Sequence, residues 1–328
     1  MVKAIWACAL FLAVLNASAA ENAGGQWIGG KVAGDPKDTG EEREYRLYVP
    51  TSYRGAPMPL VVMLHGCNQS PETFAESTRM NGLAETGQFL VLYPAQKISA
   101  NPTRCWNWFL PKNQARDSGE PAQIVAMIGQ VEKEYGVDKK RVYVAGLSAG
   151  ASMGAILAAC YPDLFAAAAL AGGTMYKSAT TLVEAGKVMA SGKAPDPDTL
   201  AAEAWACGGR RPLLMPVSVW QGQGDNIVNR DNGDQVVRQF ARFDDWADDG
   251  QANGSAVDGP NTRSGQVEGG YAYTVSTYNH RGKPLIEYYR VAKMGHAWSG
   301  GKDDLMFSDA KGPNASRIIW DFFRQYSR

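Results

Sequence analysis

The feature that most constrains the fold is a strand-to-helix turn built around one serine. Residues 142–145 are Val-Tyr-Val-Ala, and the chain continues through Gly-Leu-Ser-Ala-Gly, residues 146–150, into a helix pattern of small residues. A G-x-S-x-G sequence in this context is typical of a turn so sharp that only small residues fit two positions either side of the serine. The amide of Ala149 and the dipole of the following helix would favour negative charge beside Ser148. The alternative is a glycine-rich turn that merely contains a serine.

Alternating strand and helix patterns predict an α/β fold, with a mostly parallel sheet covered by helices on both faces. We expect strands at residues 44–49, 60–64, 89–93, 142–145, 166–170, 217–220 and 285–291. We expect helices at residues 72–85, 121–135, 148–159, 233–246 and 315–326. A further extended run at 271–278 is predicted to form a hairpin with the last strand.

Two long segments, residues 172–216 and 248–270, interrupt this alternation. Long loops in a compact domain are usually lids or mobile surface, and both leave the carboxyl side of the sheet, where substrates bind. We therefore expect lid-like insertions that wall a pocket, and the alternative is that they are passive. Residues 21–328 are expected to form a single domain.

Composition and the N-terminus bound the partners and the compartment. Lys plus Arg and Asp plus Glu each number 33, so no overall field favours nucleic acid. Residues 1–20 contain one lysine, an apolar run at 4–15 and a small-residue segment, which predicts a signal peptide cleaved near Ala19 or Ala20. The apolar run is shorter than the roughly 20 residues that span a bilayer. We expect a secreted or periplasmic protein without a membrane span.

Removal of that peptide leaves Cys67, Cys105, Cys160 and Cys207, an even number in an oxidising compartment. Four cysteines allow three pairings. We favour Cys67 with Cys105, on loops expected to meet near the face that carries the serine, and Cys160 with Cys207. The alternative is four buried thiols. The sequence has no C-x-x-C pair of the kind that binds zinc. We expect neither a metal nor an organic cofactor.

A serine hydroxyl becomes a nucleophile only beside a base that an acid orients. The chain has three histidines, and His296, just past the last expected strand, matches the order serine, acid, histidine. His65 precedes the serine and His280 lies in the hairpin turn, so neither fits. Asp225 follows an apolar strand in a glycine-rich loop and is the predicted acid.

Asp231 and Asp234 are nearby alternatives for the acid, but they belong to the approach and cap of the next helix. The second donor of an oxyanion hole usually comes from an HG-type loop after an early strand. The amide of Cys67 is predicted for that role beside the Ala149 amide. His65 would then be a structural residue that holds the loop.

Several blocks of this sequence resemble the polyhydroxybutyrate depolymerase family of esterases, which also includes feruloyl and acetylxylan esterase-like proteins. The blocks are LHGCNQ at 64–69, CWNWF at 105–109, DSGEPAQI at 117–124, GLSAG at 146–150 and GHAWSGG at 295–301. The resemblance implies an α/β-hydrolase fold and the triad Ser148, Asp225 and His296. Many members have His-Gly where this chain has Gln221-Gly222, a departure that we expect to leave the triad unaffected.

The resemblance also implies that Trp106, Trp108 and Trp298 wall the substrate site, with core packing as the alternative reading. It implies a secreted serine carboxylesterase whose partner is a hydroxyalkanoate ester, of the 3-hydroxybutyrate type, or its oligomers. The chain ends soon after its last expected helix, without a linker and binding module, which favours soluble oligomers or small esters. Alternatives are a feruloyl or acetylxylan esterase, an amidase or poly-amino-acid hydrolase with the same triad, and a non-catalytic binding protein. The acyl group, the alcohol and the oligomeric state stay open at this point.

Overall fold

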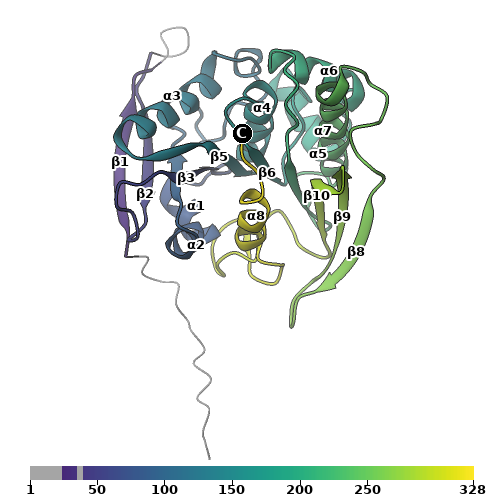
Figure 1. The fold of residues 1–328 in the computed structure, drawn as a ribbon. Helices are drawn as coiled ribbons and strands as arrows, with labels where there is room; N and C mark the ends of the chain where they lie inside the picture. Colours follow the sequence, from purple (N-terminus) through teal and green to yellow (C-terminus); the bar gives the residue numbers. More distant parts are fainter. Residues whose placement is uncertain (1–23, 35–39) are drawn as a thin grey trace, which may run out of the picture.

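In a computed structural model, which describes residues 24–34 and 40–328, the chain forms a ten-stranded sheet between two layers of helices (Figure 1). The predicted signal peptide lies outside the described residues. The strands of this sheet are β1 Gln26–Val32, β2 Arg43–Val49, β3 Met58–Leu64, β4 Leu90–Pro94, β5 Val137–Leu147, β6 Ala167–Ala171, β7 Val217–Gly222, β8 Asn261–Gln266, β9 Ala272–His280 and β10 Lys283–Val291. A separate two-residue pair joins β11 Trp298–Ser299 to β12 Ser308–Asp309.

The centre of the sheet is parallel and its two edges are antiparallel. In space the strands run β1-β2-β4-β3-β5-β6-β7-β10-β9-β8. The pairs from β4 to β10 are parallel, whereas β1, β2, β8 and β9 pair antiparallel. Because parallel strands end at the same edge, the loops after β3, β5, β7 and β10 are brought to one side of the molecule.

Each central strand is buried on both faces, which explains its continuous apolar sequence. In β3, Leu60, Val62 and Leu64 belong to one hydrophobic core, and Val61 and Met63 belong to the other. This alternation follows from the two-residue period of a strand.

Helices cover both faces of the sheet (Figure 1). The first core packs against α3 Gly119–Glu134, α4 Ala149–Cys160, α5 Leu182–Ser191, α6 Pro197–Cys207 and α7 Asp231–Asp249. The second core packs against α1 Pro71–Thr78, α2 Met80–Gly87 and α8 Ala315–Phe323. A single turn of 3-10 helix, Pro111–Asn113, precedes α3.

All seven strands expected from the sequence are present, as is the hairpin strand β9. The helix expected at 72–85 is divided into α1 and α2 instead. Arg79 adopts a left-handed conformation, with φ 54°, and its amide bonds the carbonyl of Ala75, which ends the first helix.

The two insertions contain elements that the sequence reading missed. Residues 172–216 hold α5 and α6, and Trp205 on α6 stacks on Trp246 of α7 with 5.5 Å between ring centroids. Residues 248–270 hold β8, which adds an edge strand to the sheet. Their role as lids stays a prediction.

Both favoured disulfides are formed. Cys67 is bonded to Cys105, and Cys160 at the end of α4 is bonded to Cys207 at the end of α6. Among the described residues, no helix has the length and apolar character needed to cross a membrane. The same residues contain no cluster of His, Cys, Asp or Glu suited to a metal ion.

Candidate active site

Ser148 occupies the turn between β5 and α4 in a backbone conformation that non-glycine residues rarely adopt. Its φ is 58° and its ψ is −123°. A Cβ on Gly146 would lie 2.4 Å from the backbone of Gly150, and a Cβ on Gly150 would lie 2.1 Å from the carbonyl oxygen of Leu64. The serine side chain stays partly exposed at the amino end of α4. The sharp, glycine-dependent turn expected from the sequence is therefore confirmed.

Asp225 and His296 meet on the loops that follow β7 and β10. His296 Nδ1 lies 2.7 Å from Asp225 Oδ2, and both side chains are almost fully buried. The other carboxylate oxygen of Asp225 accepts hydrogen bonds from the amides of Ile227 and Val228, at 2.9 and 2.8 Å. These contacts fix the carboxylate so that it orients the imidazole. The structure thus brings the predicted acid and base together.

The second ring nitrogen of His296 is the atom that a base would use. His296 Nε2 is buried and has no hydrogen-bond partner among the described residues. The structure therefore shows no hydrogen bond between His296 Nε2 and the Ser148 hydroxyl. Residues 171 and 172 lie close to both groups: a Cβ on Gly172 would lie 3.1 Å from His296 Cε1, and Ser148 donates its amide to the Ala171 carbonyl. Catalytic hydrogen bonds often tighten only when substrate binds.

Gln221 is a site residue that the sequence analysis set aside. Its Nε2 lies 3.2 Å from Asp225 Oδ2 and 3.3 Å from each of the carbonyl oxygens of Gly222 and Val228. Three acceptors around one nitrogen fix the orientation of this amide. Gln221 is therefore in direct contact with the predicted acid.

Gly172 gives the first testable prediction. Its φ is 55°, and an added methyl would press on the ring of His296. We expect Gly172→Ala to displace the imidazole and to lower kcat by about 10- to 100-fold, since misplacing a catalytic group by about 1 Å has effects of this size. Gly250→Ala is the matched control, because Gly250 has a φ of 78° and open space around it. Equal activity of the two variants would contradict the prediction.

The loop after β3 carries the predicted Cys67 donor. His65 Nδ1 lies 2.8 Å from the carbonyl oxygen of Gly66, and its Nε2 accepts a hydrogen bond from the amide of Gln96 at 3.2 Å. The Gln69 side chain also accepts from the Gly66 amide, at 2.9 Å. His65 is thus a buried residue that holds this loop, as expected.

Burial lowers the pKa of His65 to about 4. The unfolded histidine protonates near its ordinary value of 6.5, whereas the folded one stays neutral until about pH 4. Its contribution to stability is therefore complete above pH 6.5 and is lost progressively between pH 6.5 and 4, by about 3 kcal/mol. Urea unfolding of the wild type and of His65→Gln between pH 4 and 7 measures this slope. Parallel pH curves for the two proteins would contradict the assignment.

The three tryptophans predicted to wall the substrate site are all buried. Trp106 donates its indole N–H to the His65 carbonyl oxygen, and Trp108 packs edge-on against Phe109. Trp298 belongs to the hydrophobic core and donates to the Ser316 hydroxyl. These contacts give each indole a packing role, and contact with substrate stays a prediction.

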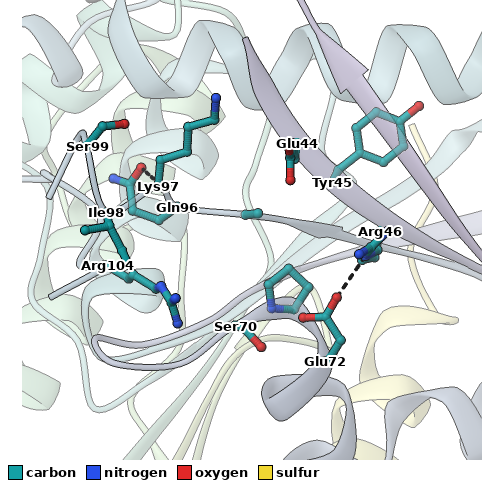
Figure 2. A pocket seen from close by; sticks show the side chains of 12 residues that line it. Glu44, Tyr45, Arg46, Ser70, Glu72, Gln96, Lys97, Ile98, Ser99 and Arg104 are labelled. Atoms are coloured by element: carbon teal, nitrogen blue, oxygen red, sulfur yellow. Dashed lines mark hydrogen bonds and ion pairs between the residues drawn. The ribbon is translucent and has the colours of Figure 1, made fainter. Parts of the chain in front are cut away.

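A cleft of about 470 Å³ lies between the start of α1 and the segment that follows β4 (Figure 2). Gln96 and Arg104 line one side of it, and Ser70 lies on the other side next to the ion pair of Arg46 with Glu72, at 2.8 Å. Neither the serine nor the Asp–His pair lines this cleft.

A parallel sheet with a serine on the turn after β5, and with an Asp–His pair after later strands, defines the α/β-hydrolase class. The fold is shared with the acetyl xylan esterase from Aspergillus awamori, which superimposes with a TM-score of 0.71 over 90% of this chain and 99% of that one at 20% identity.

The chain belongs to the esterase PHB depolymerase family, whose pattern matches residues 43–263. It is 36% identical over 247 residues to poly(3-hydroxyalkanoate) depolymerase C of Paucimonas lemoignei, covering 74% of this chain and 55% of that protein. It is 28% identical over 207 residues to acetylxylan esterase A of Emericella nidulans, covering 60% of this chain and 66% of that protein. The chain therefore spans about half to two thirds of the length of these relatives.

Proposed function

We propose that the protein is a serine carboxylesterase that hydrolyses hydroxyalkanoate esters of the 3-hydroxybutyrate type, as small esters or soluble oligomers. The observation that carries this proposal is the buried Asp225–His296 pair, whose Nε2 is unpartnered and whose ring packs against the peptide next to the Ser148 turn. Family membership and the similarity to a poly(3-hydroxyalkanoate) depolymerase support the choice of ester.

In the proposed reaction the Ser148 oxygen attacks the ester carbonyl carbon while its proton passes to His296 Nε2. The oxygen of the tetrahedral intermediate accepts hydrogen bonds from the amides of Cys67 and Ala149. His296 then returns the proton to the leaving alcohol, and an acyl-serine remains. Water, deprotonated by the same histidine, releases the hydroxy acid and restores the serine.

The Ala149 amide is suited to its role because it lies in the first turn of α4, where backbone N–H groups have no partner within the helix. The amide of Ser148 itself is engaged with the Ala171 carbonyl oxygen at 2.8 Å. Negative charge beside this helix start is favoured by the helix dipole.

Export from the cytoplasm is part of the proposal. Two disulfides are formed, and such bonds persist mainly in oxidising compartments. The signal peptide predicted at residues 1–20 would provide the route. Sequencing of the mature N-terminus from culture medium or periplasm tests this part.

Labelling with a fluorophosphonate and a product profile test the proposal together. Intact mass and peptide mapping should place the label on Ser148, and hydroxybutyrate oligomers should be cleaved faster than methyl ferulate or acetylated xylan. An amide analogue of the preferred ester should be cleaved far more slowly. Failure of the label to react would contradict the serine mechanism, and faster deacetylation of xylan would select the second candidate.

That second candidate is an esterase acting on acylated plant polysaccharide. It is favoured by the similarity of this chain to acetylxylan esterase A and to feruloyl esterase B of Neurospora crassa, which is 29% identical over 209 residues. The triad chemistry would be the same, and only the acyl and alcohol sites would differ.

A further inference from the structure

Glu120 is a buried carboxyl that the proposed proton transfer does not use. It lies in the first turn of α3 and is 2% exposed. Its Oε1 accepts hydrogen bonds from Gln96 Nε2 at 2.6 Å and from Asn107 Nδ2 at 2.7 Å, and its Oε2 accepts from the Asn107 amide at 2.8 Å. Burying a charge is costly unless it is paired and hydrogen-bonded, so such a fully satisfied carboxyl fixes the groups around it.

Burial raises the pKa of Glu120, and the hydrogen bonds from Gln96 and Asn107 oppose that rise. Gln96 and Asn107 donate in each of their hydrogen bonds to the Glu120 carboxyl group. Both carboxyl oxygens must therefore act as acceptors. Arg43, buried on β2, donates to Gln96 Oε1 at 2.9 Å and extends the same network.

Two paths lead from Glu120 to His65. Through Gln96, the backbone N–H donates to His65 Nε2, and the side chain also donates to the Cys105 carbonyl oxygen at 3.0 Å. Through Asn107, the neighbouring Trp106 is held so that its indole donates to the His65 carbonyl oxygen at 3.1 Å. The Cys67–Cys105 disulfide ties the loop to the same segment.

The direction of the Cys67 amide depends on His65, which shares the Gly66 carbonyl oxygen with the backbone N–H of Gln69, a donor at 3.3 Å. Because the Gln96 backbone N–H can only donate, His65 Nε2 is the acceptor and the ring proton of the neutral imidazole is on Nδ1. That proton bonds the Gly66 carbonyl oxygen at 2.8 Å. The Gly66 C=O and the Cys67 N–H belong to one planar trans peptide, in which the two bonds point in opposite directions.

Holding the Gly66 carbonyl toward His65 therefore directs the Cys67 N–H to the opposite side. The loop lies against the serine, since a Cβ on Gly66 would be 3.4 Å from the Cβ of Ser148. We infer that Glu120 is a positioning residue for the oxyanion hole, acting through Gln96, Asn107 and His65 on the peptide that bears the Cys67 amide. This inference rests on the proposed esterase function.

Glu120→Gln tests it, because the substitution keeps the size of the side chain but turns one acceptor into a donor that faces another donor. We expect kcat on p-nitrophenyl butyrate to fall by about 10- to 100-fold, less than the 10²- to 10³-fold typical for complete loss of an oxyanion donor. KM should change less than twofold, about the limit of measurement. The affinity for an alkyl trifluoromethyl ketone, whose serine adduct carries an oxyanion, should fall in parallel with kcat.

Asp244→Asn is the matched control. Asp244 is a fully buried carboxyl on α7 whose Oδ1 accepts from the amide of Met215, just before β7, so it lies at the opposite end of that strand from Asp225. This variant should keep the kcat and ketone affinity of the wild type. If Glu120→Gln is too unstable to purify, Gln96→Met interrupts the same path and should show the same loss of kcat at unchanged KM.

The outcomes separate this inference from the proposed function. An active wild type, with kcat and ketone affinity unchanged in Glu120→Gln, or in Gln96→Met if that variant is needed, would overturn the positioning role. A rise in KM with kcat unchanged would also overturn it, because it would indicate a defect in substrate binding. A wild type that hydrolyses no ester would instead overturn the proposed function.

Discussion

Ser148→Ala is expected to lower kcat for p-nitrophenyl butyrate by about 10⁴- to 10⁶-fold, because loss of a serine nucleophile has effects of this size in other hydrolases. The turn that carries Ser148 is held by backbone contacts. They include the hydrogen bond from the Ser148 N–H to the Ala171 carbonyl oxygen and the close approach of Gly150 to Leu64. Removing the hydroxyl leaves these contacts intact. The variant should therefore fold normally and should still bind substrate.

Ser191→Ala is the matched control, since Ser191 is exposed at the end of α5 and its hydroxyl is hydrogen-bonded to the carbonyl of Lys187 and the amide of Lys193, both outside the proposed site. Its activity should equal that of the wild type. Circular dichroism and thermal unfolding check that both variants are folded. If Ser148→Ala kept more than a few per cent of wild-type kcat, the nucleophile would have to be another group.

The serine turn could be predicted because its requirements are local. The close approach at Gly146 is to Gly150, whereas that at Gly150 is to Leu64 on the neighbouring strand β3, and the motif records both requirements. His296 could be predicted because the chain has three histidines and only one lies after the last central strand. Asp225 followed from its place at the end of β7.

The network around Glu120 could not be predicted, because its members are far apart in the sequence. His65, Gln96, Asn107 and Glu120 come from four different segments and meet only after β3, β4 and α3 have packed. The blocks LHGCNQ, CWNWF and DSGEPAQI contain His65, Asn107 and Glu120, but nothing in their sequences indicates that these side chains meet. The contact of Gln221 with the predicted acid is of the same kind, although its position four residues before Asp225 offered a signal.

The missed helix α6 had a local signal that the sequence analysis read as a loop. Pro197 occupies its first position, where proline is favoured because its missing N–H would have no partner. The edge strand β8 had none, since its sequence Asn-Thr-Arg-Ser-Gly-Gln is almost wholly exposed and does not alternate. Only its pairing with β9 makes it a strand.

Asp225→Asn is expected to lower kcat by about 10⁴-fold, and the reason lies in the hydrogen bonds around the carboxyl. The amides of Ile227 and Val228 both donate to Oδ1, so an oxygen must remain at that position. The new NH₂ group would then replace Oδ2, which now faces His296 Nδ1 and the amide of Gln221.

An NH₂ group at that position can only donate to His296 Nδ1, so the ring proton must move to Nε2. A protonated Nε2 in a neutral ring cannot accept the proton of Ser148, and catalysis fails although the geometry is preserved. Asp231→Asn, the same change at the alternative acid in the first turn of α7, should leave kcat unchanged. Because the chain has three histidines, long-range ¹H–¹⁵N spectra can assign the tautomer of each. Loss of kcat with the proton still on Nδ1 would show that Asp225 acts by its charge instead of by selecting the tautomer.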